Sequence, residues 1–126
     1  MKILCIETSC DDTAMAVLEG RGEKVKVLSN VVSSQIKLHA KYGGVVPSLA
    51  AREHTKNVGH VFELALKEAG IKNFKKEIDA IAVTRGPGLG PSLLVGISFA
   101  KTISWLCKKP LIGVNHLEGH IYSNWL

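Results

Sequence analysis

Two histidines near the end of the sequence, His116 and His120, have a spacing that suits metal binding. If residues 117–125 are helical, side chains four residues apart lie on one face, and both imidazoles can reach the same ion. Glu118 points away from that face, unlike the glutamate of the HExxH zinc proteases, which directly follows the first histidine. A transition-metal site takes at least three protein ligands, so the pair is incomplete. The alternative is a surface pair at the start of a helix.

A second polar group is the segment ETSCDDT at residues 7–13. Its hydroxyls and backbone N–H groups, at a turn between two apolar runs, can bind phosphate oxygens. The adjacent carboxylates of Asp11 and Asp12 can hold a divalent cation or orient a nucleophile, and without such a role they repel each other. The alternative is an ordinary polar hairpin tip, since Ser, Asp and Thr are common in turns. Cys10 has no cationic neighbour, which disfavours a reactive thiolate.

The segment RGPGLGPS at residues 85–92 is a third candidate. It follows an apolar run and precedes a predicted helix, where anions bind through close approach to the backbone. Gly86, Gly88 and Gly90 are therefore candidate ligand-binding residues. The segment matches neither GxGxxG nor the Walker pattern, and a plain strand-to-helix turn is the alternative.

Apolar periodicity predicts the elements that position these groups. Short apolar runs predict strands at residues 2–8, 13–18, 24–32, 78–84 and 111–115. Helical spacing over 49–69, with Pro47 before it and Gly70 after it, predicts a long helix. A second helix runs from Pro91 to about 108, and a third begins at His116. The order β-β-β-α-β-α-β-α predicts an α/β fold with a five-stranded mixed sheet and helices on both faces.

Composition narrows the class of protein. A chain of 126 residues is about one domain, and 46% hydrophobic with 21% charged residues is typical of globular proteins. The net charge of +5 fits either a lysine-rich solvated surface or a partner that carries phosphates. Three cysteines without a CxxC pair indicate a reducing, cytoplasmic location. No apolar stretch is clean enough for a membrane span, so no membrane partner is expected. His39, His54 and His60 are expected in solvent or at helix caps.

Four segments together resemble one known family. In chain order they are MKILCIETSCDDTAMAVLE (1–19), HAKYGGVVPSLAAREH (39–54), GPGLGPSLLVG (86–96) and VNHLEGH (114–120). They are similar to the bacterial-type TsaD family of tRNA adenosine threonylcarbamoyltransferases, formerly known as glycoproteases or O-sialoglycoprotein endopeptidases. The chain departs from the family at Ser48, where an acidic residue is usual, so a role for that carboxylate is in doubt.

The resemblance implies an RNase H-like lobe of the actin/Hsp70/sugar-kinase (ASKHA) architecture over residues 1–126, with a second lobe that is absent from this sequence. His116 and His120 match the family's metal ligands, for iron or zinc, and a third protein ligand is expected from the missing lobe. The remaining matches are assigned to catalysis (Asp11 and Asp12) and to an adenylate-type ligand (Glu7, Ser9, Gly86, Gly88 and Gly90). Among these, Asp11 is the best candidate for an electrostatic or proton-transfer role.

The resemblance also implies the reaction and the partners. The whole enzyme would transfer threonylcarbamoyl from threonylcarbamoyl-adenylate to the tRNA adenosine next to the anticodon. It would work with a TsaB-type paralogue and a TsaE-type ATPase in the cytoplasm, and the lobe alone is expected to be inactive. The alternatives are a non-catalytic scaffold lobe like the TsaB paralogue, which needs no metal ligands, and the metalloprotease of the old family name, which needs a glutamate base that HLEGH does not position.

Overall fold

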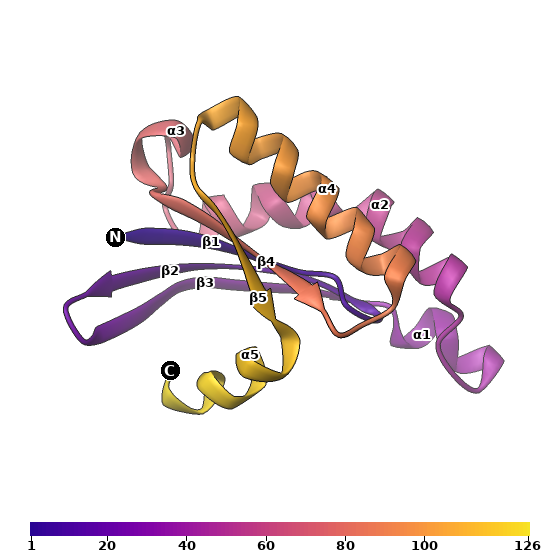
Figure 1. The fold of residues 1–126 in the computed structure, drawn as a ribbon. Coiled ribbons are helices and arrows are strands. Elements are labelled where there is room, and N and C mark those ends of the chain that lie inside the picture. The colour runs from indigo at the N-terminus through magenta and orange to yellow at the C-terminus, as the bar shows by residue number, and fades with distance from the viewer.

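Five strands form a single mixed sheet in the computed structural model, which describes residues 1–126, in the order β3-β2-β1-β4-β5 (Figure 1). The antiparallel meander comprises β1 (Lys2–Glu7), β2 (Asp12–Arg21) and β3 (Lys24–Ser34). On the other side of β1, β4 (Ala80–Gly86) and β5 (Leu111–Asn115) continue the sheet in parallel. The predicted meander with two crossover units is confirmed.

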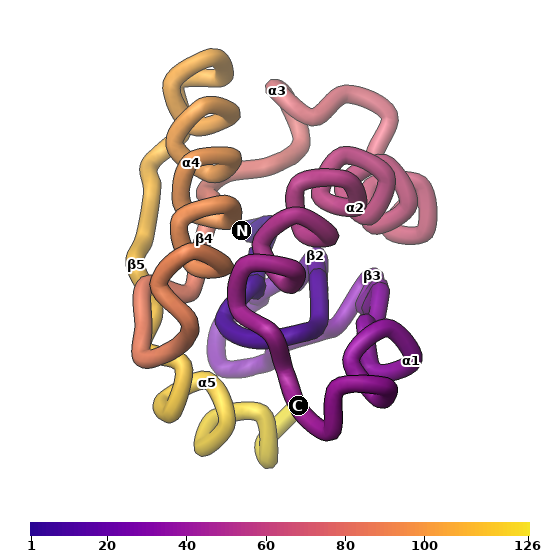
Figure 2. Tube along the Cα trace, turned by 90° about the vertical axis from the view of Figure 1, so that its right-hand side faces the viewer, coloured from indigo at the N-terminus to yellow at the C-terminus, as the bar shows by residue number.

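Helices lie on both faces of this sheet, as predicted, but they cover the two faces unequally. The two long helices lie side by side on one face, and the C-terminal segment lies below the other (Figures 1 and 2). In chain order the helical elements are α1 (Ile36–His39), η1 (Ala40–Tyr42), α2 (Pro47–Glu68), α3 (Phe74–Glu77), α4 (Gly90–Cys107), α5 (His116–Tyr122) and η2 (Ser123–Trp125).

The hydrophobic core lies between the sheet and the helices α2 and α4. Alternate residues of β1 and β2 point into it, and Leu4, Ile6, Met15 and Val17 are at most 2% exposed. This alternation follows from the two-residue period of a strand, which sends successive side chains to opposite faces. The core therefore fixes the register of β1 and β2 and, with it, the position of the loop that joins them.

Two of the three histidines expected in solvent or at caps are buried instead. His54 is fully buried and His39 is 3% exposed, so that expectation is wrong for both, while His60 is exposed as predicted. The reason is the helix face: His54 lies on the same stripe of α2 as the buried Ala50 and Val61. Spacings of four and seven residues return to one side of a helix, so the stripe carries His54 toward the sheet.

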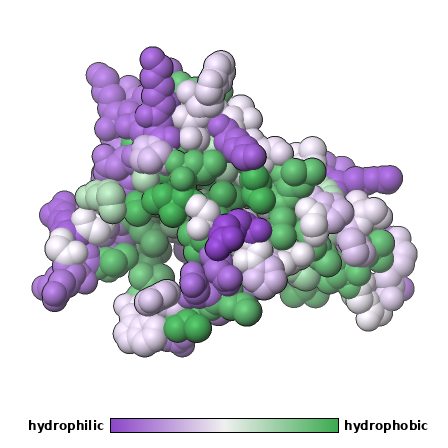
Figure 3. All heavy atoms as spheres, in the orientation of Figure 1, coloured by the Kyte–Doolittle hydropathy of each residue, from purple (hydrophilic) through white to green (hydrophobic).

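Apolar side chains also lie on the surface. They gather across much of the face that Figure 1 presents, with most hydrophilic residues toward its margins (Figure 3). Exposed examples are Leu94, Leu106, Leu111 and Ile112. None of the helices combines the length and the apolar character needed to cross a membrane.

Candidate functional site

The polar residues of the site meet at one edge of the sheet. β1, β4 and β5 run parallel to one another, so their carboxyl ends lie at the same edge. Glu7 is the last residue of β1, Thr84 lies near the end of β4, and His116 directly follows β5. Residues more than 70 positions apart in the sequence are thus brought into hydrogen-bonding contact.

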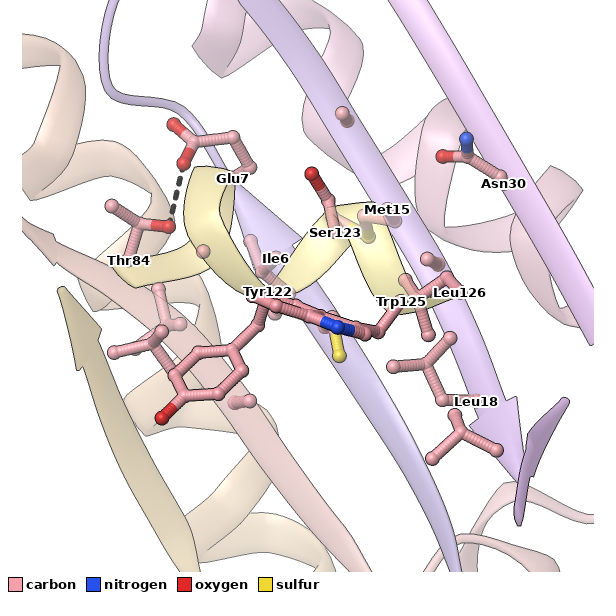
Figure 4. Close-up of a pocket in the computed structure, with 18 of the residues that line it drawn as sticks. Ile6, Glu7, Met15, Leu18, Asn30, Thr84, Tyr122, Ser123, Trp125 and Leu126 are labelled. Atoms are coloured by element: carbon pink, nitrogen blue, oxygen red, sulfur yellow. Dashed lines mark hydrogen bonds between the residues drawn. The ribbon is translucent and has the colours of Figure 1, made fainter. Parts of the chain in front are cut away.

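Glu7 is the centre of this group. Its carboxylate accepts hydrogen bonds from the backbone N–H of Ser9, from the Thr84 hydroxyl at 2.6 Å (Figure 4) and from His116 Nδ1 at 3.1 Å. Burial is the largest influence on the pKa of Glu7 and raises it, but the hydrogen bonds from Ser9, Thr84 and His116 outweigh burial and lower the pKa below its ordinary value. The side chain is therefore a carboxylate at neutral pH, held in one orientation.

This carboxylate sets the protonation pattern of His116. A proton on Nδ1 is shared with Glu7 Oε2, and Ser9 Oγ lies 3.2 Å from the same nitrogen. The Nε2 atom is then left with a free lone pair. Asn115 is the N-cap of the following helix, and its Oδ1 accepts a hydrogen bond from the N–H of Leu117 at 2.9 Å. This cap fixes the start of the helix and therefore the position of His116, its first residue.

His120 completes the pair. Its Nε2 atom lies 3.0 Å from Nε2 of His116, and the two rings are perpendicular with centroids 4.5 Å apart. At this nitrogen–nitrogen distance the two rings share a hydrogen bond. Two nitrogens bound to one tetrahedral zinc ion at about 2.0–2.1 Å stand about 3.3–3.4 Å apart, so a separation larger by a few tenths of an ångström would let both nitrogens bind one metal. Glu7 on the far side of His116 matches the carboxylate–histidine–metal arrangement. The donor set fits a metal ion, but residues 1–126 hold no group of three or more such ligands.

The loop between β1 and β2 carries the other candidates. Ser9 is buried, Asp11 and Asp12 are partly exposed, and one carboxylate oxygen of Asp12 is buried without a hydrogen-bond partner. Cys10 is largely exposed. The pKa of its thiol is raised, first by the small part of it that is buried, and then by a hydrogen bond with Asp11 and by the nearby carboxylates. The raised pKa disfavours a thiolate at neutral pH and so agrees with the expectation that Cys10 is not a reactive nucleophile.

The glycine-rich segment packs directly against this loop. A Cβ added to Gly88 would lie 2.6 Å from the carbonyl oxygen of Ser9, and the N–H of Leu89 donates to the same oxygen at 2.7 Å. In the second turn of α4, a Cβ on Gly96 would lie 2.4 Å from Thr8 Oγ1. The glycines at 88 and 96 therefore allow α4 and its leading turn to lie against residues 8 and 9.

The other two predicted glycines have different surroundings. Gly86 has a φ of 142°, a conformation that side chains rarely adopt, and precedes the cis bond to Pro87. Gly90 has nothing within 4 Å of an added Cβ. Only Gly88 of the three thus contacts a residue of the site, and ligand binding by Gly86, Gly88 and Gly90 stays a prediction.

Comparison with known proteins decides the family. The family model described as TsaD, tRNA N6-adenosine threonylcarbamoyltransferase, matches residues 26–126. The chain belongs to the TsaD family. Curated relatives carrying that enzyme name include those of Thermomicrobium roseum (60% identical) and Persephonella marina (58% identical), each matched over the whole of this chain. The chain spans only 33% and 35% of the length of these two relatives.

Solved structures show the same fold in other proteins. YeaZ from Pseudomonas aeruginosa matches with a TM-score of 0.63 and 21% identity, over 91% of this chain and 45% of its own. RuvC from T. thermophilus, solved with a Holliday junction, matches with a TM-score of 0.58 and 13% identity, over 93% of this chain and 67% of its own. At these identities the likeness concerns the fold alone, and it agrees with the RNase H-like architecture expected of this TsaD chain.

An apolar pocket of about 590 Å³ lies between the partly covered face of the sheet and the C-terminal segment of this TsaD chain (Figure 4). The small side chains of Ala14 and Ala16 line it, and Tyr122 and Trp125 lie across it. Glu7 is at one end of the pocket, with Thr84 beside it. The rest of its lining is mostly apolar, with Glu23 and Asn30 among the polar exceptions.

Sequence reasoning missed two residues of this TsaD site. Thr84 ends an apolar run, so the sequence predicts only a strand residue there. In the structure its hydroxyl donates a hydrogen bond to the Glu7 carboxylate. His54, assigned to solvent or a cap, donates from Nε2 to the Cys10 carbonyl at 3.0 Å. Its place on the apolar stripe of the long helix was the available signal.

The partly buried thiol of Cys5 gives a direct check of this part of the sheet. Burial raises the pKa of Cys5 from its ordinary 9.0 to about 11, so at pH 8 the thiolate fraction falls about 100-fold. Alkylation of Cys5 by iodoacetamide, followed by peptide mass spectrometry, is expected to be slower than in urea-unfolded chain by about that factor. Equal rates in both states would contradict the burial.

Proposed function

We propose that this chain is the part of a threonylcarbamoyl transferase that holds the metal-side ligands and the first substrate loop. The donor is threonylcarbamoyl-adenylate, and the acceptor is the N6 amine of the tRNA adenosine next to the anticodon. The observation that carries the proposal is the convergent pair of His116 and His120, oriented by Glu7, in a chain that belongs to the TsaD family.

The transfer is an acyl exchange at one carbon atom. A bond forms between the adenine N6 and the carbamoyl carbon, and the bond from that carbon to the phosphate oxygen of the adenylate breaks. AMP leaves with the electron pair, and the attacking amine must give up one proton. The site therefore needs a group that activates the carbonyl, a proton acceptor, and contacts that place the adenylate.

The histidine pair serves the first need. His116 and His120 would hold an iron or zinc ion through their Nε2 atoms, and a bound metal supplies Lewis-acid activation and a template for the donor. Glu7 keeps the Nδ1 proton of His116 and so presents the Nε2 lone pair outward. The third protein ligand is proposed to come from the second lobe of the whole enzyme.

The loop at residues 9–12 serves the other needs. Asp11 is proposed to take the proton of the attacking amine, and Asp12, which has a buried oxygen without a partner, is proposed to assist it. Ser9 and the glycine-rich turn at residues 86–90 are proposed to contact the adenylate, since the turn lies against Ser9. Glu7 acts through His116 and Ser9 in this arrangement.

The whole enzyme has further proposed parts and partners. We place this chain as one lobe of a two-lobed protein, consistent with its spanning about a third of its curated relatives. A TsaB-type paralogue and a TsaE-type ATPase are the proposed protein partners, tRNA is the substrate, and the cytoplasm is the proposed location.

The test is transfer by the whole enzyme, including both lobes and metal. Incubation with threonylcarbamoyl-adenylate and tRNA is expected to release one AMP for each modified adenosine, measured by nucleoside mass spectrometry. Asp11→Asn, which removes the proton acceptor at nearly constant size, is expected to lower kcat by about 10²–10⁴-fold. AMP release without modified tRNA, or a fully active Asp11→Asn enzyme, would contradict the proposed roles.

Glu7→Gln isolates the orienting carboxylate from the metal ligands themselves. The carboxylate charge that faces His116 Nδ1 is lost while the side-chain size is kept, so metal affinity is expected to fall about 10- to 100-fold. Competition with a coloured chelator measures the affinity directly. Glu63→Gln, on the exposed side of α2, is the matched control and should bind metal like the wild type. Equal affinities for the two variants would exclude the orienting role.

A further inference from the structure

A chain of hydrogen bonds inside the protein joins the loop at residues 9–12 to the segment that leads into α2. Its four side chains are almost completely buried: Thr13 and His54 at 0% exposed, His39 at 3% and Gln35 at 4%. None of them is assigned to the metal or to the substrate. Buried polar groups are costly unless they are paired, and all four of these are paired with one another or with backbone groups.

One end of the chain fixes the direction of its hydrogen bonds. The N–H of Val46 can only donate, and it lies 3.3 Å from His39 Nδ1, so His39 carries its proton on Nε2. That Nε2–H donates to Gln35 Oε1 at 3.0 Å. The Gln35 amide is then oriented so that its Nε2 donates to the carbonyl of Ala50 at 3.3 Å.

The other end reaches the loop. The carbonyl of Cys10 can only accept, so His54 carries its proton on Nε2 and donates to it at 3.0 Å. His54 Nδ1 then accepts from the Thr13 hydroxyl at 2.8 Å. The backbone N–H of Gln35 donates to the carbonyl of Asp11 at 3.0 Å. Two successive carbonyls of the loop are therefore held by residues of the α2 side.

We infer that His54 is a positioning residue that holds the Cys10 carbonyl and thereby sets the backbone that presents Asp11 and Asp12. Residues 8–11 belong to no helix or strand, so the partners of their backbone groups decide their conformation. The contribution of His54 to catalysis rests on the proposed function, because it matters only if the Asp11 loop acts on the transferring group. The hold on the loop itself does not depend on that function.

The experiment compares two substitutions in the whole enzyme. His54→Leu removes all three hydrogen bonds of the ring: to the Cys10 carbonyl, the Thr13 hydroxyl and the Gln35 amide at 3.4 Å. His54→Gln retains an N–H near the position of Nε2 and can still donate to the Cys10 carbonyl. Hydrogen exchange of a peptide covering residues 8–14, read by mass spectrometry, reports the loop directly. His54→Leu is expected to speed this exchange and to lower kcat about 10- to 100-fold, with metal affinity unchanged. His54→Gln is expected to restore most of both.

A milder variant and a control complete the test. Thr13→Val is nearly isosteric and removes only the hydroxyl that donates to His54. It should also speed hydrogen exchange of the loop. This variant keeps the test decisive if His54→Leu does not fold. His60→Leu, on the exposed side of α2, should change nothing. Unchanged exchange in His54→Leu or Thr13→Val, or failure of His54→Gln to restore the loop, would overturn the inference. A wild-type enzyme without transferase activity would refute the proposed function while the exchange data still decide the role of His54.

Discussion

Replacing His116 with alanine in the proposed two-lobed enzyme is expected to abolish metal binding at the histidine pair and to lower threonylcarbamoyl transfer by more than about 100-fold. The substitution deletes one of two convergent Nε2 donors and, with it, the only histidine that Glu7 orients. A single remaining imidazole at His120, which lies on the exposed surface, is a weak site. Metal content by atomic emission and transfer by tRNA nucleoside analysis are the two measurements.

The controls separate loss of metal from loss of fold. His60→Ala removes an exposed imidazole from the middle of α2 and should keep both metal and activity. His120→Ala should behave like His116→Ala, because both nitrogens face the same point. A thermal transition like that of the wild type is expected for each variant, since His120 is exposed and His116 is only partly buried. Full metal content and activity in His116→Ala would eliminate the pair as a metal site.

Gly88→Ala is expected to destabilise the protein by about 1–3 kcal/mol and, by displacing the substrate loop, to reduce transfer. Its Cβ would lie 2.6 Å from the Ser9 carbonyl oxygen and 3.1 Å from the Ser9 Cα. These are backbone atoms, which cannot swing aside as a flexible side chain can. Either the turn or the substrate loop must move, and the Leu89 N–H to Ser9 carbonyl bond moves with them.

The matched control lies two residues away. Gly90→Ala adds the same methyl group where nothing stands within 4 Å, and it occupies the first position of α4, so it should be neutral or slightly stabilising. Urea denaturation of both variants measures the difference in free energy of unfolding, and the transfer assay measures its consequence. If Gly88→Ala were as stable as Gly90→Ala, the close packing of the turn on Ser9 would be refuted.

The architecture could be predicted because its signals are local. Short apolar runs at residues 2–8 and 13–18 are typical of buried strands, and the apolar stripe over 49–69 follows from the period of a helix. The short turns after residues 8 and 20 leave no length for a crossover, so the first three strands had to form a meander. The handedness of the later crossovers placed β4 beside β1.

The site could be predicted only as separate pieces. The spacing of His116 and His120 by itself indicated a shared face, and their Nε2 atoms do converge. Glu7 was assigned to a phosphate-side loop, but nothing in the order of residues indicates that its carboxylate lies 3.1 Å from a histidine 109 positions later. That contact depends on three parallel strands ending at one edge, which is a property of the assembled sheet.

By itself, the sequence determined the element order, the sheet topology, the family and the candidate groups. Each of these depends on the spacing of residues over short segments or on the order of short motifs along the chain. The tertiary structure alone decided which polar groups meet. It placed His54 within hydrogen-bonding distance of the Cys10 carbonyl, Gly88 in close contact with Ser9, and the Glu7 carboxylate beside His116 Nδ1. The physical reason is that hydrogen bonds and close packing act over about 3 Å in space, whatever the distance along the chain, so only the packed fold shows which residues can form them.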